Sequence, residues 1–173
     1  CSSEIWNNKN RFYDAYLKKF DGYYDTSDAG IIDKNGYISV MSRTDDIINC
    51  AGHRLSTGSI EEILTQHKDV AECAVVGFND ELKGQVPIGL IVLNTTSTNS
   101  EETIIKETID LVREKLGPVA SYKKSIIVEN LPKTRSGKIL RSTISKILNR
   151  ENYKAPATIE DINTLELIKN LKV

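Results

Sequence analysis

The stretch VAECAVVGFNDELKGQVPIGLIVL, residues 70–93, decides the fold. Residues 70–78 and 86–93 are short runs rich in β-branched side chains, which favour strands. The polar segment NDELKG, residues 79–84, separates the two runs and is typical of a turn. The stretch therefore predicts two strands joined by a polar turn.

On the C-terminal side of this stretch we expect a helix, a third strand and another helix. Residues 101–116 carry apolar residues at helical spacing, and Gly117 with Pro118 ends that pattern. Residues 125–128 predict a short strand, and the apolar residues within 139–148 outline the next helix.

On the N-terminal side we expect a hairpin, a linker and a short helix. Asn35-Gly36 lies between two β-rich runs in residues 31–40, and such a pair suits a tight turn because it accepts positive φ. Residues 42–56 are dense in Arg, Asp, Asn and Gly and predict a linker, after which Thr57 is the expected N-cap of a helix. Three strands and three helices around one core predict an α+β domain of roughly a hundred residues.

Composition excludes several classes of protein. The 23 Lys and Arg nearly balance the 24 Asp and Glu, so no bulk field favours nucleic acid or an anionic membrane surface. No apolar run approaches the roughly 20 residues of a membrane span. The cysteines, Cys1, Cys50 and Cys73, are widely spaced, which argues against a disulfide framework and a zinc site and favours a reducing, intracellular compartment.

The beginning of the chain is aromatic but without clear local structure. Residues 1–28 hold most of the aromatic side chains, and as far as Phe20 they show neither helix caps nor clean periodicity. Because the first residue is Cys1 rather than methionine, we expect a truncated or proteolysed N-terminus whose aromatic residues packed against something larger.

The segment TRSGK, residues 134–138, is the sharpest chemical feature. Small, flexible residues there deliver Lys138 between a strand and a helix. It is not a P-loop, because the first glycine of that motif is missing and Ile139 replaces its Ser or Thr. A lysine on such a loop can neutralise negative charge that develops in a phosphate reaction. The open alternative is an ordinary solvated lysine near a helix start.

Four motifs together resemble a known family. YDTSD (24–28), SRTDDIIN (42–49), GHRLST (52–57) and PKTRSGKILR (132–141) occur in family order and at family-like spacing. They resemble the adenylate-forming enzymes, most closely the acetyl- and propionyl-CoA synthetases. The resemblance covers nearly the whole chain, and the ordered set is specific although each motif alone is weak.

The resemblance implies three ATP-binding residues. Asp28 matches an aspartate that holds the ribose hydroxyls, since a carboxylate accepts two hydrogen bonds at once. Arg43 matches an arginine that also reaches the ribose. Arg54 matches one that contacts nucleotide phosphate through its planar fork of donors. Outside the family they would be a turn aspartate and two surface ion-pair partners.

The resemblance also implies a CoA site, a hinge and a catalytic lysine. Gly52 matches a glycine where the pantetheine arm of CoA passes close to the backbone, and Arg113 matches an arginine near the CoA nucleotide phosphate. Asp45 falls at the hinge between an adenylation pose and a thioester-forming pose. Lys138 matches the adenylation lysine, which in the family is also a target of regulatory acylation.

Some residues depart from the family pattern or form no site. Ser27 and Ser42 stand where the family commonly has glycine, and because both are small we expect backbone adjustment rather than lost function. His53 and His67 do not have metal-ligand spacing, so we expect no metal site made by these residues.

The resemblance implies an organisation and a reaction. Residues 1–44, hairpin included, would be the end of a large N-terminal adenylation domain, residues 45–155 a mobile C-terminal lid domain with a three-stranded sheet, and residues 156–173 a tail. A short-chain carboxylate and ATP with Mg²⁺ would give acyl-adenylate and pyrophosphate, after which CoA displaces AMP. The expected partners are ATP, CoA, the carboxylate and the chain's own N-terminal domain. The fragment alone would be inactive.

Alternatives stay open at this stage. The chain could be a non-catalytic module that binds CoA or a protein, or the lid of a medium-chain or aryl acyl-CoA ligase. The string GHRLST resembles the short-chain branch, and residues 40–46 and 158–161 resemble propionyl- more than acetyl-CoA synthetase. The family resemblance allows the mitochondrial matrix or the cytoplasm.

Overall fold

A computed structural model describes residues 6 and 8–172, apart from the side chains of Lys9, Met41 and Asp45. The chain divides into two compact units, Cys1–Asp45 and Asp46–Val173. The prediction about Cys1 lies outside the described residues. In the part of the chain that is described, no helix is long and apolar enough to cross a membrane.

The first unit contains a helix that the sequence analysis missed. Helix α1 spans Lys9–Tyr16, and the Asn8 side chain caps it by accepting a hydrogen bond from the Arg11 N–H. Aromatic rings pack beside the helix: Tyr16 stacks on Tyr24 with 5.0 Å between ring centroids, and Phe12 lies 5.3 Å from Tyr16. Part of the aromatic content near the N-terminus is therefore used within the unit.

The predicted hairpin is confirmed, with a different turn. Strand β1 (Asp28–Ile32) pairs antiparallel with β2 (Ile38–Arg43). The Asp33 carboxylate accepts hydrogen bonds from the Asn35 and Tyr37 N–H groups, and only Gly36 of the Asn-Gly pair has positive φ, at 86°. The loop is therefore longer than a two-residue turn, because the Asp33 side chain organises it.

The second unit is built on a five-stranded sheet. Strands β5 (Val70–Asp80) and β6 (Gly84–Leu93) pair antiparallel along their whole length, as residues 70–93 predict. The third predicted strand, β7 (Lys124–Ile127), pairs parallel with β6. The other two strands, β3 (Ile47–Cys50) and β4 (His53–Ser56), form a hairpin that joins β6 at Gly84. The prediction of a linker over residues 42–56 is therefore wrong, because β3 and β4 occupy most of this segment and pair with each other.

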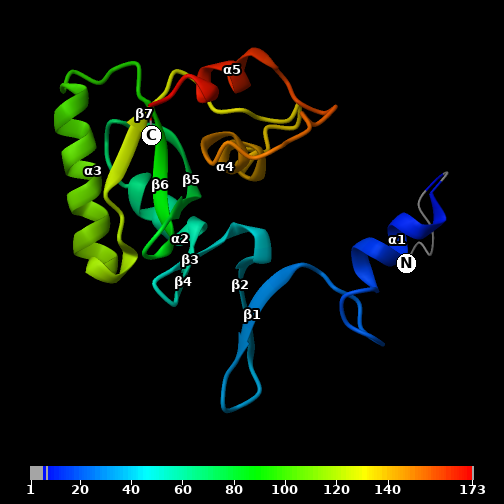
Figure 1. The fold of residues 1–173 in the computed structure, drawn as a ribbon. Helices are drawn as coiled ribbons and strands as arrows, with labels where there is room; N and C mark the ends of the chain where they lie inside the picture. Colours follow the sequence, from blue (N-terminus) through cyan, green and yellow to red (C-terminus); the bar gives the residue numbers. More distant parts are fainter. Residues whose placement is uncertain (1–5, 7, 173) are drawn as a thin grey trace. The chain divides into compact units, whose positions relative to one another are not determined.

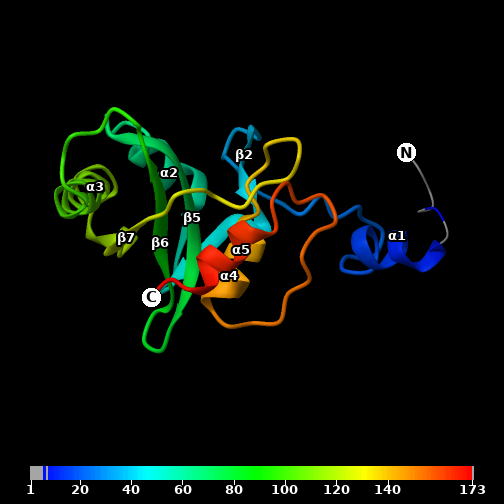
Figure 2. The ribbon, with the colours of Figure 1, turned by 90° about the horizontal axis from the view of Figure 1, so that it is seen from above.

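Helices cover both faces of this sheet, which confirms the α+β class. Helices α2 (Thr57–Leu64) and α3 (Glu101–Leu116) pack on one face, and α4 (Arg141–Leu148) and α5 (Asn163–Lys169) lie on the other. Figures 1 and 2 show α3 and the α4–α5 pair on opposite sides of β5 and β6. Short 3₁₀ turns occupy Thr44–Asp46 and Pro118–Ala120.

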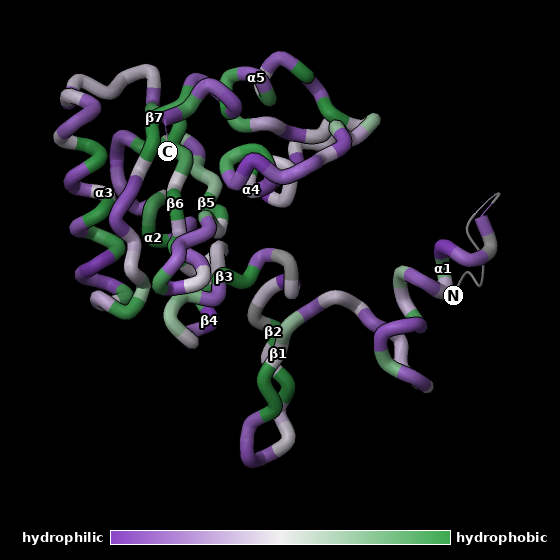
Figure 3. Tube along the Cα trace, viewed as in Figure 1, coloured by the Kyte–Doolittle hydropathy of each residue, from purple (hydrophilic) through white to green (hydrophobic). Residues whose placement is uncertain are grey.

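Alternation along the strands divides the core in two. Cys73 and Val75 of β5 face α2 and α3, whereas Ala74 and Val76 face α4 and α5. Both faces are buried, so β5 reads as a nearly continuous apolar run rather than an alternating one. Figure 3 shows hydrophilic and hydrophobic residues following one another around α3, as expected for a helix with one buried face.

Both ends of α3 match the prediction, whereas the starts of α4 and α2 differ from it slightly. Helix α3 begins and ends where its apolar spacing predicts, with the Ser100 side chain accepting from the Thr103 N–H and Gly117 after its end at φ 78°. Helix α4 starts slightly later than expected. The predicted N-cap Thr57 is instead the first residue of α2, where it is buried, and Ser56 is the N-cap without a side-chain bond.

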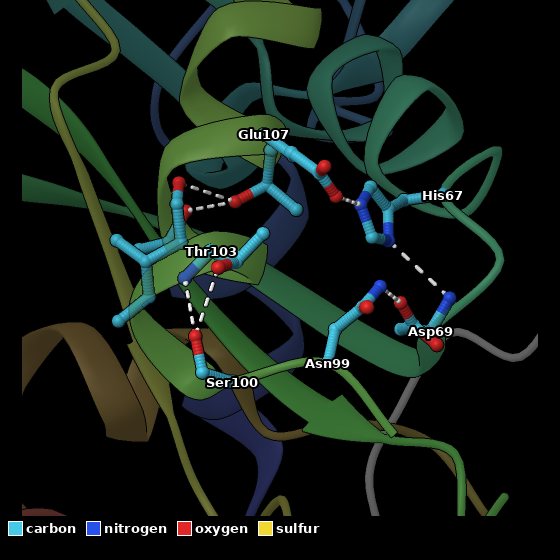
Figure 4. A network of polar contacts seen from close by, with 9 residues as sticks. His67, Asp69, Asn99, Ser100, Thr103 and Glu107 are labelled. Carbon is cyan, nitrogen blue, oxygen red and sulfur yellow. Dashed lines mark hydrogen bonds and ion pairs between the residues drawn. The ribbon is translucent and has the colours of Figure 1, made fainter. Parts of the chain in front are cut away.

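A polar network fastens the end of α2 to α3 (Figure 4). His67 Nε2 lies 2.9 Å from a carboxylate oxygen of Glu107 in α3, while its Nδ1 accepts a hydrogen bond from the Asp69 N–H. The Asp69 carboxylate in turn accepts from the amide of Asn99, which precedes α3. His67 is therefore a structural histidine with both ring nitrogens in use.

The segment expected as a C-terminal tail packs on the second unit. Leu165 and Ile168 of α5 are buried in the same cluster as the apolar face of α4. Upstream of α5, the Glu160 N–H donates to the Lys133 carbonyl and the Arg135 N–H donates to the Thr158 carbonyl. Residues 158–160 are therefore hydrogen-bonded along one side of the loop that carries Lys138.

Candidate functional site

The structure brings Asp28 and Arg43 together. They are paired residues at one end of the β1–β2 ladder, and both are exposed. The Arg43 Nη1 donates to the Thr26 carbonyl at 3.5 Å, and the Asp28 N–H donates to the Thr26 hydroxyl at 3.3 Å. Two residues that the family resemblance assigns to one ribose therefore lie side by side on one hairpin.

Ser27, just before Asp28, has a conformation that suits the glycine expected there from the family resemblance. Its φ is 58°, in the left-handed region that glycine adopts most easily. Its N–H donates to the Asp25 carboxylate at 2.7 Å, and its carbonyl accepts from the Thr44 N–H at 2.8 Å. The backbone thus keeps the left-handed turn with serine in place, which costs about 1–2 kcal/mol of strain.

Asp45 lies within the 3₁₀ turn Thr44–Asp46, and the two compact units divide directly after it. Its side chain is outside the described part of the chain. The turn follows β2, which carries Arg43, and precedes β3. A hinge at Asp45 remains a prediction that its backbone position suits.

Gly52 forms the turn of the β3–β4 hairpin together with Ala51. The φ angles are 48° at Ala51 and 84° at Gly52, the signature of a two-residue turn with both central residues left-handed. An added Cβ at Gly52 would meet no atom within 4 Å. The turn is thus exposed, and Arg54 follows it on β4, opposite Asn49 and also exposed.

Lys83 connects the Gly52 turn to the surroundings of Arg113. Its carbonyl accepts from the Ala51 N–H at 2.8 Å, and its ammonium donates to the Ser121 hydroxyl at 2.9 Å. Ser121, Arg113 and Lys123 line an open pocket of about 470 Å³. The other lining residues are Ile109, Gly117, Pro118 and Tyr122. Lys83, which the sequence analysis did not assign, therefore contacts both the turn that holds Gly52 and a residue of the pocket that Arg113 lines.

Lys138 stands on a closed hairpin, the Lys138 loop, defined here as residues 133–139. The Thr134 N–H donates to the Lys138 carbonyl at 2.9 Å, and the Gly137 N–H donates to the Thr134 carbonyl at 2.8 Å. The Thr134 hydroxyl also accepts from the Lys138 N–H at 3.1 Å. Gly137 has φ 82°, so its glycine is required by the turn itself. Lys138 is exposed at the end of this hairpin.

The loop is better ordered than its small residues suggest. Lys133 and Ile139 pair as an antiparallel bridge across it, and Thr134 pairs with Ile159 on its outer edge. Its backbone is therefore hydrogen-bonded on both sides. The sequence indicated a mobile loop because glycine and serine fit flexible segments and tight hairpins alike.

The buried cysteines are not reactive groups. Cys50 and Cys73 are free and buried. Burial raises the pKa of the Cys73 thiol from its ordinary 9.0 to about 12, and the nearby Glu61 carboxylate adds to the rise. Among the described residues, no three His, Cys, Asp or Glu side chains are grouped to hold a metal ion.

The fold agrees with the proteins that this chain is similar to. The family model of the AMP-binding enzyme C-terminal domain matches residues 59–138. Mouse acyl-CoA synthetase short-chain family member 3, mitochondrial, is 52% identical over 159 residues, covering 92% of this chain and 23% of that protein. Acetyl-coenzyme A synthetase 1 of Candida glabrata is 47% identical over 167 residues, covering 93% and 23%.

A solved structure gives the same result. The crystal structure of Brucella canis acyl-CoA synthetase matches with a TM-score of 0.58 and 30% identity, covering 78% of this chain and 25% of that chain. The chain spans about a quarter of the length of the curated relatives it matches. Residues 59–138 belong to the AMP-binding enzyme C-terminal domain family, and the chain matches the C-terminal part of short-chain acyl-CoA synthetases.

Proposed function

We propose that this chain works as the C-terminal part of an AMP-forming short-chain acyl-CoA synthetase. In the first step the carboxylate attacks the α-phosphate of ATP and releases pyrophosphate. In the second step the CoA sulfur attacks the acyl carbon of the adenylate and AMP leaves. The chain contributes groups to both steps, and the rest of the active site belongs to the larger protein.

One observation carries the proposal: Lys138 is an exposed cation at the end of a hydrogen-bonded hairpin. A positive charge placed by an ordered backbone stabilises charge that builds up on phosphate oxygens without first having to reorganise. The adenylation step needs such a charge, because negative charge develops on the phosphate as the carboxylate attacks it. Mg²⁺ would accompany ATP, with ligands outside the residues described.

The remaining site residues fit the two substrates. Asp28 and Arg43, adjacent on β1 and β2, would hold the ATP ribose, and Arg54 would contact nucleotide phosphate. The open Gly52 turn would let the pantetheine arm pass close to the backbone, and the pocket beside Arg113 would receive the CoA nucleotide. Asp45 would be the hinge between the two steps.

The organisation and substrate follow the same reasoning. Residues 1–44 would be the end of the large N-terminal domain, whose surface would cover exposed apolar side chains such as Ile38 and Val40. The mouse relative is called short-chain and mitochondrial, which supports a short carboxylate and the mitochondrial matrix, with the cytoplasm as the alternative. Residues 40–46 and 158–161 support propionate over acetate.

The experiment measures carboxylate-dependent ATP–pyrophosphate exchange and acyl-CoA formation by the full-length protein, with acetate, propionate, octanoate and benzoate. We expect both activities, with the highest kcat/KM for propionate. Preference for octanoate or benzoate would replace the short-chain assignment. If calorimetry detected CoA binding while exchange was absent for every acid, the chain would be a binding module instead.

A further inference from the structure

Two ion pairs, one from the first residue of the Lys138 loop and one from just after its last residue, attach the loop to the core of its unit. On the N-terminal side, the Lys133 ammonium lies 2.7 Å from Glu72 Oε1 and 2.5 Å from Glu72 Oε2. On the C-terminal side, Arg141 donates from Nε to Glu61 Oε1 at 2.7 Å and from Nη2 to Glu61 Oε2 at 2.8 Å. The acceptors come from β5 and α2, far from the loop in sequence.

The Glu61–Arg141 pair is the stronger of the two. It is bidentate and partly buried, with the Glu61 side chain 12% exposed and that of Arg141 26% exposed. Glu61 Oε1 also accepts from the Val75 N–H at 2.8 Å, so α2, β5 and the start of α4 meet at one carboxylate. The hydrogen bonds that Arg141 donates to Glu61 raise the pKa of Arg141, and attraction to Asp46 adds to the rise.

We propose that Glu61 and Glu72 are positioning residues for adenylation: through Arg141 and Lys133 they hold the two ends of the Lys138 loop against α2 and β5. The proposal rests on the adenylation role of Lys138 proposed above. Between the two ion pairs the backbone is closed by the Lys133–Ile139 bridge and the Thr134–Lys138 bonds, so a shift at either end reaches Lys138. A displacement of about 1 Å at a reacting group is enough to slow catalysis by roughly 100-fold.

The two half-reactions test this in the full-length protein. Adenylation is followed by ATP–pyrophosphate exchange with propionate, and thioester formation by propionyl-CoA release from synthetic propionyl-AMP and CoA. We expect exchange to fall about 10-fold or more in Glu61→Gln, where the charged fork is lost. In Glu72→Gln, where the carboxylate is itself more exposed (44% against 12% for Glu61), we expect a fall of up to about 5-fold. In both variants thioester formation should stay within about 2-fold of the unmodified protein.

The controls separate positioning from general damage. Glu166→Gln removes another Glu–Lys pair, with Lys169 on α5, and should leave both half-reactions unchanged. The charge reversal Glu72→Lys with Lys133→Glu should recover most of the exchange that either single change loses. If Glu61→Gln does not fold, Glu72→Gln and the reversal decide the question.

Two results would overturn the inference. One is equal slowing of both half-reactions in Glu61→Gln and Glu72→Gln, which would mean that the pairs stabilise the fold only. The other is unchanged exchange in both variants while Lys138→Ala abolishes it. If Lys138→Ala itself left exchange intact, the adenylation role of Lys138 would fail, and that outcome is distinguishable from the other two.

Discussion

At residue 89 of β6 the fold accepts no side chain larger than a hydrogen. A Cβ built there would lie 2.0 Å from the Tyr122 hydroxyl oxygen and 3.0 Å from its Cζ. Tyr122 is 5% exposed, and its hydroxyl lies 2.7 Å from the Ser125 hydroxyl, so the ring has no room to move away. Gly89 is thus required by packing and not by backbone conformation.

We therefore expect Gly89→Ala to lower the free energy of unfolding by about 1–3 kcal/mol, measured by urea denaturation. Gly58→Ala is the matched control. It lies in α2 with only the Ser56 hydroxyl within 4 Å of the added Cβ, at 3.6 Å, and should stabilise the protein by about 0.5–1 kcal/mol. Equal effects of the two substitutions would contradict the close contact at Tyr122.

Cys73 supplies a prediction about pH. With a pKa of about 12, its thiolate fraction at pH 8 is about 10⁻⁴, so iodoacetamide should leave Cys73 unmodified in the folded protein. Mass spectrometry reads the result, and the same reaction in guanidinium chloride, where the chain is unfolded, should modify it fully. Rapid alkylation under native conditions would mean that the thiol is not buried.

The same group predicts a loss of stability in alkali. Between pH 9 and 12 the unfolded chain releases the Cys73 proton while the folded chain keeps it. The contribution of the protonated Cys73 thiol to the free energy of unfolding is therefore fully present below pH 9. It is lost as the pH rises towards 12, at up to about 1.4 kcal/mol per pH unit. Burial raises the pKa of Tyr122 as well, in the same direction. Urea midpoints measured at pH 8 and pH 10.5 check the fall, and Cys73→Ala should reduce it.

At the scale of elements, the sequence predicts the long elements with strong periodicity correctly, but it does not reveal the short strands. The apolar spacing of α3 predicted that helix to the residue, and the β-branched runs of β5 and β6 predicted those strands to within two residues at the turn. Strands β3 and β4 have four residues each, and their Ala51-Gly52 turn lacks the usual asparagine, so the segment reads as linker. Helices α1 and α5 were also missed, because they are too short to show a clear helical periodicity.

The β3–β4 turn allows conformation and ligand binding to be separated. Gly52→Ala places alanine at φ 84° without any clash, so we expect a loss of only about 1–2 kcal/mol in the free energy of unfolding. If pantetheine passes this turn, the KM for CoA should rise by an order of magnitude or more, far beyond any effect on pyrophosphate exchange. An unchanged KM for CoA would remove Gly52 from the CoA site.

At the scale of the whole molecule, the chain divides directly after Asp45. The first unit leaves large side chains uncovered, with Trp6 95%, Tyr23 75% and Tyr37 73% exposed. We expect chymotrypsin to cleave the free chain first after these residues and to leave the second unit intact, because that unit buries its own core. Early cleavage after Phe78 or Tyr122 would contradict this difference in stability.

The sequence indicates the candidate residue Lys138, but it does not indicate the residues that hold the Lys138 loop in place. Lys138 is recognisable because its loop residues are neighbours in sequence. The carboxylates of Glu61 and Glu72 meet that loop only through folding, since nothing local marks a partner that far away. The positive φ of Ser27 is also invisible in sequence, because serine does not signal a left-handed residue as glycine does.

The charge on Lys138 is the central claim, and its direct test is the rate of pyrophosphate exchange in full-length Lys138→Ala. We predict that exchange falls by about 100-fold or more, while propionyl-CoA formation from synthetic propionyl-AMP stays within about threefold. Exchange at the unmodified rate, or an equal loss in both half-reactions, would contradict a role for this lysine in adenylation.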